Sequence, residues 1–128
     1  MATVEVTFAP LPAHVRTARL VATAVARRSG VAESLLDEVR LAVGEACTRA
    51  VEAHQRFCPA EPVRLSLTDQ PGRFEIAVTD SGAGSESVAP TGLALAVIAG
   101  LADEVKISET SAGTSVIMSW PSSGVLAG

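Results

Sequence analysis

The segment Val78-Thr79-Asp80-Ser81-Gly82-Ala83-Gly84 is the most informative stretch of the 128-residue sequence. An acidic residue ends a predicted buried strand, and two glycines in alternating positions follow it. A carboxylate at such a place can accept a hydrogen bond from an exocyclic amine, and glycines let backbone approach a ligand closely. The same residues also fit a simple turn with a capping Asp, so the segment alone leaves both interpretations open.

The residues before this segment predict a strand, two helices and a hairpin. Residues 4–8 alternate apolar and polar side chains, which is the period of a half-buried strand. Apolar residues then recur on one helical face over residues 13–29 and again over about 33–56. From residue 63 to 78 the period returns to two, and Pro71-Gly72 favours the turn between two strands.

The residues after this segment complete the predicted element order. A loop of small residues over 81–91 leads into an apolar helix over Gly92–Leu101, and two further strands follow. The order β-α-α-β-β-α-β-β predicts an α+β two-layer sandwich. One mixed or antiparallel sheet of about five strands is covered on one face by three helices. We expect residues 1–121 to form one domain and residues 122–128 a flexible tail.

Composition excludes several functions. With 10 Lys and Arg against 14 Asp and Glu, the net charge is −4, which argues against direct binding of nucleic acid. No apolar run reaches the roughly 18 residues that span a bilayer, and the N-terminus lacks the pattern of a signal peptide. We therefore expect a cytoplasmic protein without membrane contact. Its two cysteines, Cys47 and Cys58, are not expected to form a disulfide.

Stacking surfaces for a base or sugar are scarce, because aromatic residues make up only 3% of the sequence. The only candidates are Phe8, Phe57, Phe74 and Trp120.

Three further segments contain residues that suggest a binding or catalytic role. Glu45 and Arg49 lie one turn apart in the second predicted helix, which also fits an exposed ion pair worth only a few tenths of a kcal/mol. Gly92 opens the third helix, where free backbone N–H groups can meet an anion, although the residue also fits plain helix initiation. Gly113-Thr114 is a turn that leads into the last strand.

Taken in order, these signals resemble the GHKL ATPase fold. The whole chain is similar to the small anti-sigma regulatory factors with serine-protein kinase activity. The likeness covers roughly residues 4–121 and is carried by residues 8–19, 41–51, 78–84 and 113–120. It implies a nucleotide site, with ATP and Mg²⁺ as cofactors, and protein partners: a sigma factor and an anti-anti-sigma (STAS-type) protein.

The resemblance assigns nucleotide-binding roles to several residues. Asp80 matches the acid that recognises the adenine amino group. Gly82 and Gly84 match the glycines beside the base. Gly92 matches the last glycine before the helix that follows the lid, and Thr114 matches the hydroxyl that supports the adenine site.

Other roles concern phosphoryl transfer and partner binding. Glu45 matches the catalytic Glu, which acts as base in an active kinase. Arg19 matches a position used to contact the sigma factor and the anti-anti-sigma protein, and we assign Arg16 to the same partner-binding group. Both arginines also fit a simple solvated helix face.

The departures from the family pattern point away from kinase activity. The Asn that ligates Mg²⁺ is replaced by Arg49, whose guanidinium has no acceptor and would repel the ion or occupy its place. Arg49 would contact phosphate directly if nucleotide did bind. The lid is short, without Lys or Arg, and Pro90 replaces a glycine whose N–H would meet phosphate. These departures argue against ATP binding, and Mg²⁺ is not expected to bind in the usual way.

Three hypotheses follow. The first is an anti-sigma-type regulator of transcription that binds its protein partners with weakened or lost kinase activity. The second is an active ATP-dependent serine kinase of an anti-anti-sigma protein. The third is a small α+β domain whose glycines are only turns. The strand at residues 4–8 is a predicted sheet edge, and such edges can pair in a homodimer.

Overall fold

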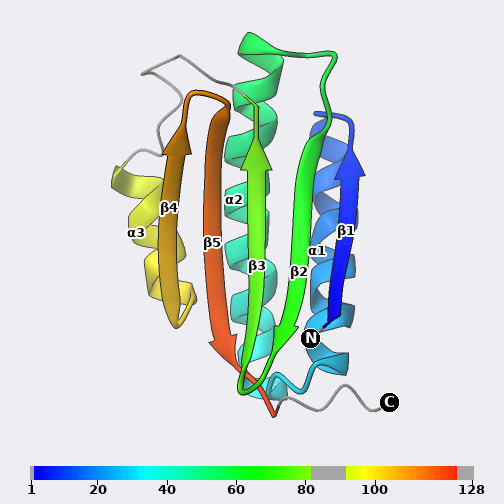
Figure 1. The fold of residues 1–128 in the computed structure, drawn as a ribbon, viewed down its shortest axis with the longest axis vertical. Helices are drawn as coiled ribbons and strands as arrows, with labels where there is room; N and C mark the ends of the chain where they lie inside the picture. The colour runs from blue at the N-terminus through cyan, green and yellow to red at the C-terminus, as the bar shows by residue number, and fades with distance from the viewer. Residues whose placement is uncertain (1, 82–91, 124–128) are drawn as a thin grey trace.

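A five-stranded antiparallel sheet forms one layer of the fold (Figure 1). The computed structural model describes residues 2–81 and 92–123. In spatial order the strands are β1 (Ala2–Phe8), β2 (Val63–Gln70), β3 (Arg73–Asp80), β5 (Gly113–Pro121) and β4 (Glu104–Thr110). β1 and β4 are the edges of the sheet, so the N-terminal strand is at an edge, as predicted.

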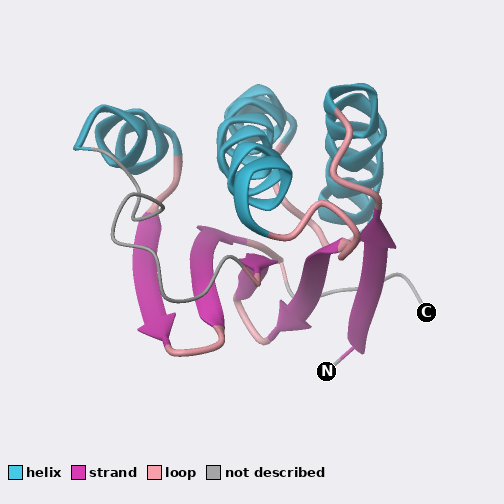
Figure 2. Cartoon of the chain, turned by 90° about the horizontal axis from the view of Figure 1, so that it is seen from above, coloured by secondary structure: helices cyan, strands magenta, loops and turns pink. Residues whose placement is uncertain are grey.

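Three helices form the second layer, and Figure 2 shows all of them on the same face of the sheet. They are α1 (Pro12–Arg28), α2 (Leu36–Phe57) and α3 (Gly92–Leu101), with a 3-10 turn at Glu33–Leu35 before α2. The predicted α+β two-layer sandwich is confirmed. In the described part of the chain, no helix combines the length and the apolar character needed to cross a membrane.

Two boundaries differ from the prediction for local reasons. The first helix begins at Pro12, one residue earlier than expected, because proline suits the first turn, where its missing N–H has no intrahelical acceptor. The second helix was predicted from residue 33, but residues Glu33–Leu35 form the 3-10 turn and the α-helical hydrogen bonds begin at Leu36.

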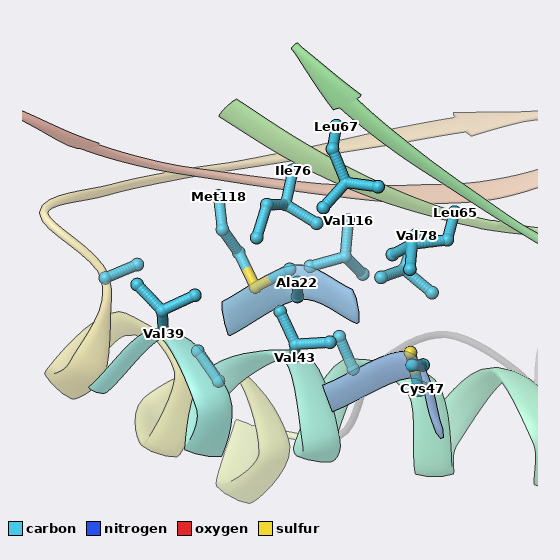
Figure 3. Packing of buried hydrophobic residues seen from close by; sticks show 14 of the residues in the cluster. Ala22, Val39, Val43, Cys47, Leu65, Leu67, Ile76, Val78, Val116 and Met118 are labelled. Atoms are coloured by element: carbon cyan, nitrogen blue, oxygen red, sulfur yellow. The ribbon is translucent and has the colours of Figure 1, made fainter. Parts of the chain in front are cut away.

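The core lies between the sheet and the helices, as Figure 3 shows for its central part. Val39 and Val43 of α2 contribute to it opposite Ile76, Val116 and Met118 of the sheet. On β3 every second side chain is buried, beginning with Phe74. Because successive strand residues point to opposite faces, this alternation fixes which side chains face the helices.

The core also contains two of the four aromatic residues that the sequence offers for stacking. Phe74 and Trp120 are buried, and the indole N–H of Trp120 donates to the carbonyl of Leu101 at 3.0 Å. They are therefore structural, and the prediction that they offer a stacking surface is wrong. Phe57 is exposed at the end of α2, with the Arg56 guanidinium 5.4 Å from its ring centroid.

Candidate functional site

Asp80 lies at the end of β3 and faces the helices. It occupies the next inward position after Phe74, Ile76 and Val78, so the strand alternation buries a carboxyl group where three apolar side chains precede it. Across the ladder, Asp80 pairs with Thr114 at the start of β5, and Thr114 is buried too. The two residues that the sequence analysis assigned to one adenine site are therefore neighbours.

Arg49 reaches this carboxylate from α2. It lies three residues after Ala46 and four before Ala53, both buried, so its side chain leaves the helix on the side of the sheet. Its Nη2 donates to Oδ2 of Asp80. The Arg49 side chain is 10% exposed and that of Asp80 is fully buried. Helical spacing does not suggest this partner, which is 31 residues away in sequence.

Gly113 lets the start of β5 pack closely against the backbone of Asp80 at this corner of the fold. Its φ of +149° lies in a region that side chains rarely adopt, and a Cβ there would lie 1.9 Å from the carbonyl oxygen of Asp80. The turn predicted at Gly113-Thr114 thus lies against the Asp80–Ser81 peptide. A side chain at position 113 would push apart the backbone that carries the carboxylate.

His54 supports the same corner, and sequence analysis assigned it no role. Its ring is completely buried near the end of α2. Nδ1 lies 2.8 Å from the carbonyl oxygen of Glu61, and Nε2 lies 2.8 Å from the amide nitrogen of Ser81. A carbonyl only accepts and an amide N–H only donates, so these partners assign the neutral tautomer protonated at Nδ1. His54 thereby fixes the residue that follows Asp80.

A signal for His54 was present in the periodicity of α2. His54 lies four residues after Ala50 and seven after Cys47, both buried, so it continues their inward stripe. A histidine at an inward helical position needs hydrogen-bond partners for both ring nitrogens. That requirement predicts a structural contact but does not identify its partners.

The expected partner-binding residues lie on α1. Arg16 is exposed, whereas Arg19 is half-buried against α2. A Cβ added to Gly44 would lie 2.9 Å from Cδ of Arg19, so the arginine stem crosses α2 where a glycine leaves room for it. Glu45, the expected base, is the next residue and is half-buried. The structure therefore fixes the stem of Arg19 between two helices.

The remaining predicted nucleotide residues are only partly described. Gly92 is the first residue of α3, as expected. Gly82, Gly84 and Pro90 lie outside the described residues, together with the rest of the predicted loop. The described part of the site therefore consists of Asp80, Arg49 and Thr114, together with Gly113 and His54, which position the backbone around Asp80.

Neither cysteine adds a nucleophile to this arrangement. Both are free thiols. Burial raises the pKa of Cys47 to about 12, against a smaller opposing effect of the Arg19 guanidinium. Desolvation also raises the pKa of Cys58, with the carboxylates of Glu61 and Asp80 acting in the same direction. Since the thiolate is the reactive form, both environments disfavour thiol chemistry at neutral pH.

The donor set at this corner bears on the ATP and Mg²⁺ that the family resemblance implies. Adenine would present its amino group to the Asp80 carboxylate, which the Arg49 guanidinium contacts. Arg49 also stands where a metal-ligating Asn is expected, and a guanidinium has no lone pair for a cation. Within residues 2–81 and 92–123, no three His, Cys, Asp or Glu side chains are grouped to hold a metal ion.

Comparisons with known proteins agree with the architecture. A family model described as the histidine kinase-like ATPase domain matches residues 8–120. A solved structure of the RsbU and RsbW domains of Rv1364c from Mycobacterium tuberculosis matches 93% of this chain with a TM-score of 0.71 and 19% identity. This chain spans about a third, 32%, of that solved chain. A search of curated proteins found no match.

Proposed function

The chain belongs to the histidine kinase-like ATPase domain family, and we propose that it is a regulator of transcription that binds protein partners without transferring phosphoryl groups. Its partners would be a sigma factor, an anti-anti-sigma protein of the STAS type, or both. The observation that carries this proposal is the buried ion pair between Arg49 and Asp80.

The ion pair affects two requirements of the kinase reaction through one residue. Arg49 contacts the carboxylate that would recognise adenine, and it replaces the side chain that would ligate Mg²⁺. A guanidinium stays protonated at any physiological pH and binds a carboxylate strongly in a water-poor site. Nucleotide would have to displace this charge before the metal could bind, and Arg49 would still supply no metal ligand.

The rest of the fold supports a role in binding proteins. The sheet, the three helices and the turn at Gly113 all form although Arg49 stands beside Asp80 in place of the expected Asn. The similarity to a structure that contains an RsbW domain favours partners of the sigma-regulatory kind. On α1, Arg16 and Leu20 are exposed beside the fixed stem of Arg19, and together they offer a basic and apolar surface to a partner.

The proposal is tested with defined partners. Candidate sigma factors and STAS-type proteins are purified singly, mixed with this protein, and analysed by size-exclusion chromatography and then with labelled ATP and Mg²⁺. We expect a stable complex with at least one candidate and no label on it. Arg19→Glu should abolish the complex, whereas Arg64→Ala, on the opposite face of the sheet, should not.

An active kinase is the second candidate, and the position of Glu45 favours it. This side chain is half-buried one helical turn before Arg49, where the expected base belongs. Transfer of label to a serine of a bound STAS-type protein, lost in Glu45→Ala, would establish the kinase and refute the first proposal. A bound partner that stays unlabelled would refute the kinase.

A further inference from the structure

Within the described residues, the backbone around the Asp80 carboxylate is supported by several elements. Asp80 is positioned by the β3–β5 ladder, with Thr114 opposite, and Gly113 leaves its backbone uncovered by a side chain. His54 fixes the next amide, that of Ser81. None of these supports comes from Arg49. The backbone that carries the carboxylate is therefore positioned by elements other than Arg49.

Arg49 presents to this carboxylate the same kind of group that an adenine base would present. A guanidinium offers planar N–H donors, and the exocyclic amine of adenine also offers N–H donors. The arginine carries a permanent charge and comes from the same chain, so it pays no translational entropy of association. A neutral amine in solution competes poorly with such an internal donor.

The residues present do not fit the nucleotide that the family binds. We therefore infer that the Arg49 side chain occupies a latent adenine site of its own chain. The chain keeps the adenine acceptor, and its own arginine fills it. Substituting this one residue with a smaller neutral side chain opens the site to adenine nucleotides. This inference rests on the proposed function, because it explains how a partner-binding regulator of this family works without nucleotide.

The experiment compares nucleotide binding by Arg49→Asn and by the wild-type protein. ADP is titrated into each protein without Mg²⁺ in a calorimeter, so that neither catalysis nor metal ligation contributes. We expect no saturable binding to wild type at about 1 mM ADP and a gain of at least about tenfold in affinity for Arg49→Asn. GDP should show no gain, because guanine carries a carbonyl oxygen where adenine carries its amine.

Two matched variants test separately the positive charge at position 49 and the carboxylate acceptor at position 80. Arg49→Lys keeps a cation at the position and should stay closed to ADP. The double variant Arg49→Asn/Asp80→Asn has no carboxylate and should lose the gain. Binding by the double variant, or equal binding of ADP and GDP by Arg49→Asn, would overturn the inference because adenine would then not be read by Asp80.

Folding of Arg49→Asn must be checked, since the substitution leaves Asp80 charged and buried. Circular dichroism and the fluorescence of the single tryptophan, Trp120, report the native state. If that variant does not fold, Arg49→Gln takes its place, because its neutral amide can still donate to Asp80 yet can be displaced. A folded variant with no gain in ADP binding overturns the inference.

The wild-type protein gives a test that needs no variant. Saturable ADP binding by wild type below about 100 µM would show that Arg49 does not close the site, and the inference would fail. The proposed function could still stand, because it concerns phosphoryl transfer to a partner. Label transfer to a partner by wild type would refute the proposed function, whereas an absent gain in the variant refutes only the inference.

Discussion

Strand β3 has ion pairs at both of its ends, and the pairs at the two ends differ in their exposure to water. At its first residue, Arg73 contacts Asp103 at 2.8 Å and Glu104 at 3.3 Å, and these side chains are 29–58% exposed. At its last residue, Asp80 contacts Arg49, and that pair is almost entirely removed from solvent. The same strand thus carries the same chemistry in two environments.

Burial decides how much each ion pair contributes to stability. Water and salt screen the exposed pairs, so each contributes little to stability and can form and break freely. A buried pair has already lost its hydration, so removing one partner leaves an uncompensated charge. The exposed cluster therefore contributes little to the stability of the sheet, whereas the buried pair connects helix α2 to strand β3.

The largest expected effect is the loss of Arg49. Arg49→Ala should lower the free energy of unfolding by about 3–5 kcal/mol, because Asp80 stays buried without its cation. Urea unfolding followed by Trp120 fluorescence measures it. Arg40→Ala is the matched control on the same helix, since its 3.1 Å pair with Asp37 is exposed, and it should cost less than about 0.5 kcal/mol. Equal losses in the two variants would contradict the comparison.

A smaller effect is expected when the support from His54 is removed. His54→Phe fills the same buried space but leaves the Ser81 amide and the Glu61 carbonyl without their hydrogen bonds. We expect a loss of about 2–4 kcal/mol and faster hydrogen exchange at Ser81, read by NMR. His14→Phe removes the 3.2 Å contact with the Ala9 carbonyl oxygen but keeps an aromatic ring beside Phe8, and it should change little. Unchanged exchange at Ser81 would show that His54 does not fix this corner.

The next effect concerns the close contact at Gly113. Gly113→Ala should cost about 1–3 kcal/mol from its backbone conformation alone, and more from the contact with Asp80. Gly72→Ala is the control at the other end of β3, where φ is also positive, +75°, but no atom of the described residues lies within 4 Å of an added Cβ. The stability difference between the two variants contains the contact at Gly113 together with the more strained backbone conformation there. If Gly72→Ala proved the more damaging, the close approach at Gly113 would be refuted.

The smallest effect is expected at the exposed end of the strand. Arg73→Ala should cost less than about 1 kcal/mol, and the contribution of its ion pairs should disappear in about 1 M salt, leaving only that of its 2.9 Å hydrogen bond to Ser119. Unfolding curves at low and high salt measure it. The loss in Arg49→Ala should persist in salt, because counterions do not reach a buried pair. A large, salt-resistant loss in Arg73→Ala would remove the contrast between the two ends.

The fold could be predicted from the sequence because local patterns determine it. The period-two alternation at Phe74, Ile76 and Val78 predicted the buried strand that Asp80 ends, and the helical stripe of α2 followed from period 3.6. The place of Asp80 next to Thr114 was also implied, through the family resemblance. These features can be inferred from residues that are close in sequence or from a known order of secondary-structure elements.

The contacts of the site could not be predicted in the same way. Helical spacing offered Arg49 a partner at Glu45, but the contact with Asp80 depends on how α2 lies over β3, which no local pattern encodes. The partners of His54 are a carbonyl and an amide from two separate segments. Tertiary contacts of this kind decide whether a family motif keeps its chemistry, and they require the three-dimensional structure.

A double-mutant cycle on Arg49 and Asp80 measures directly whether the two side chains stabilise each other. The free energies of unfolding of wild type, Arg49→Ala, Asp80→Ala and the double variant give the coupling between the two side chains. We expect a coupling of at least about 2 kcal/mol, with the double variant more stable than Arg49→Ala because it buries no lone charge. Additivity within about 0.5 kcal/mol would mean that the Arg49 and Asp80 side chains do not stabilise each other, and the ion pair could then not be what closes this corner.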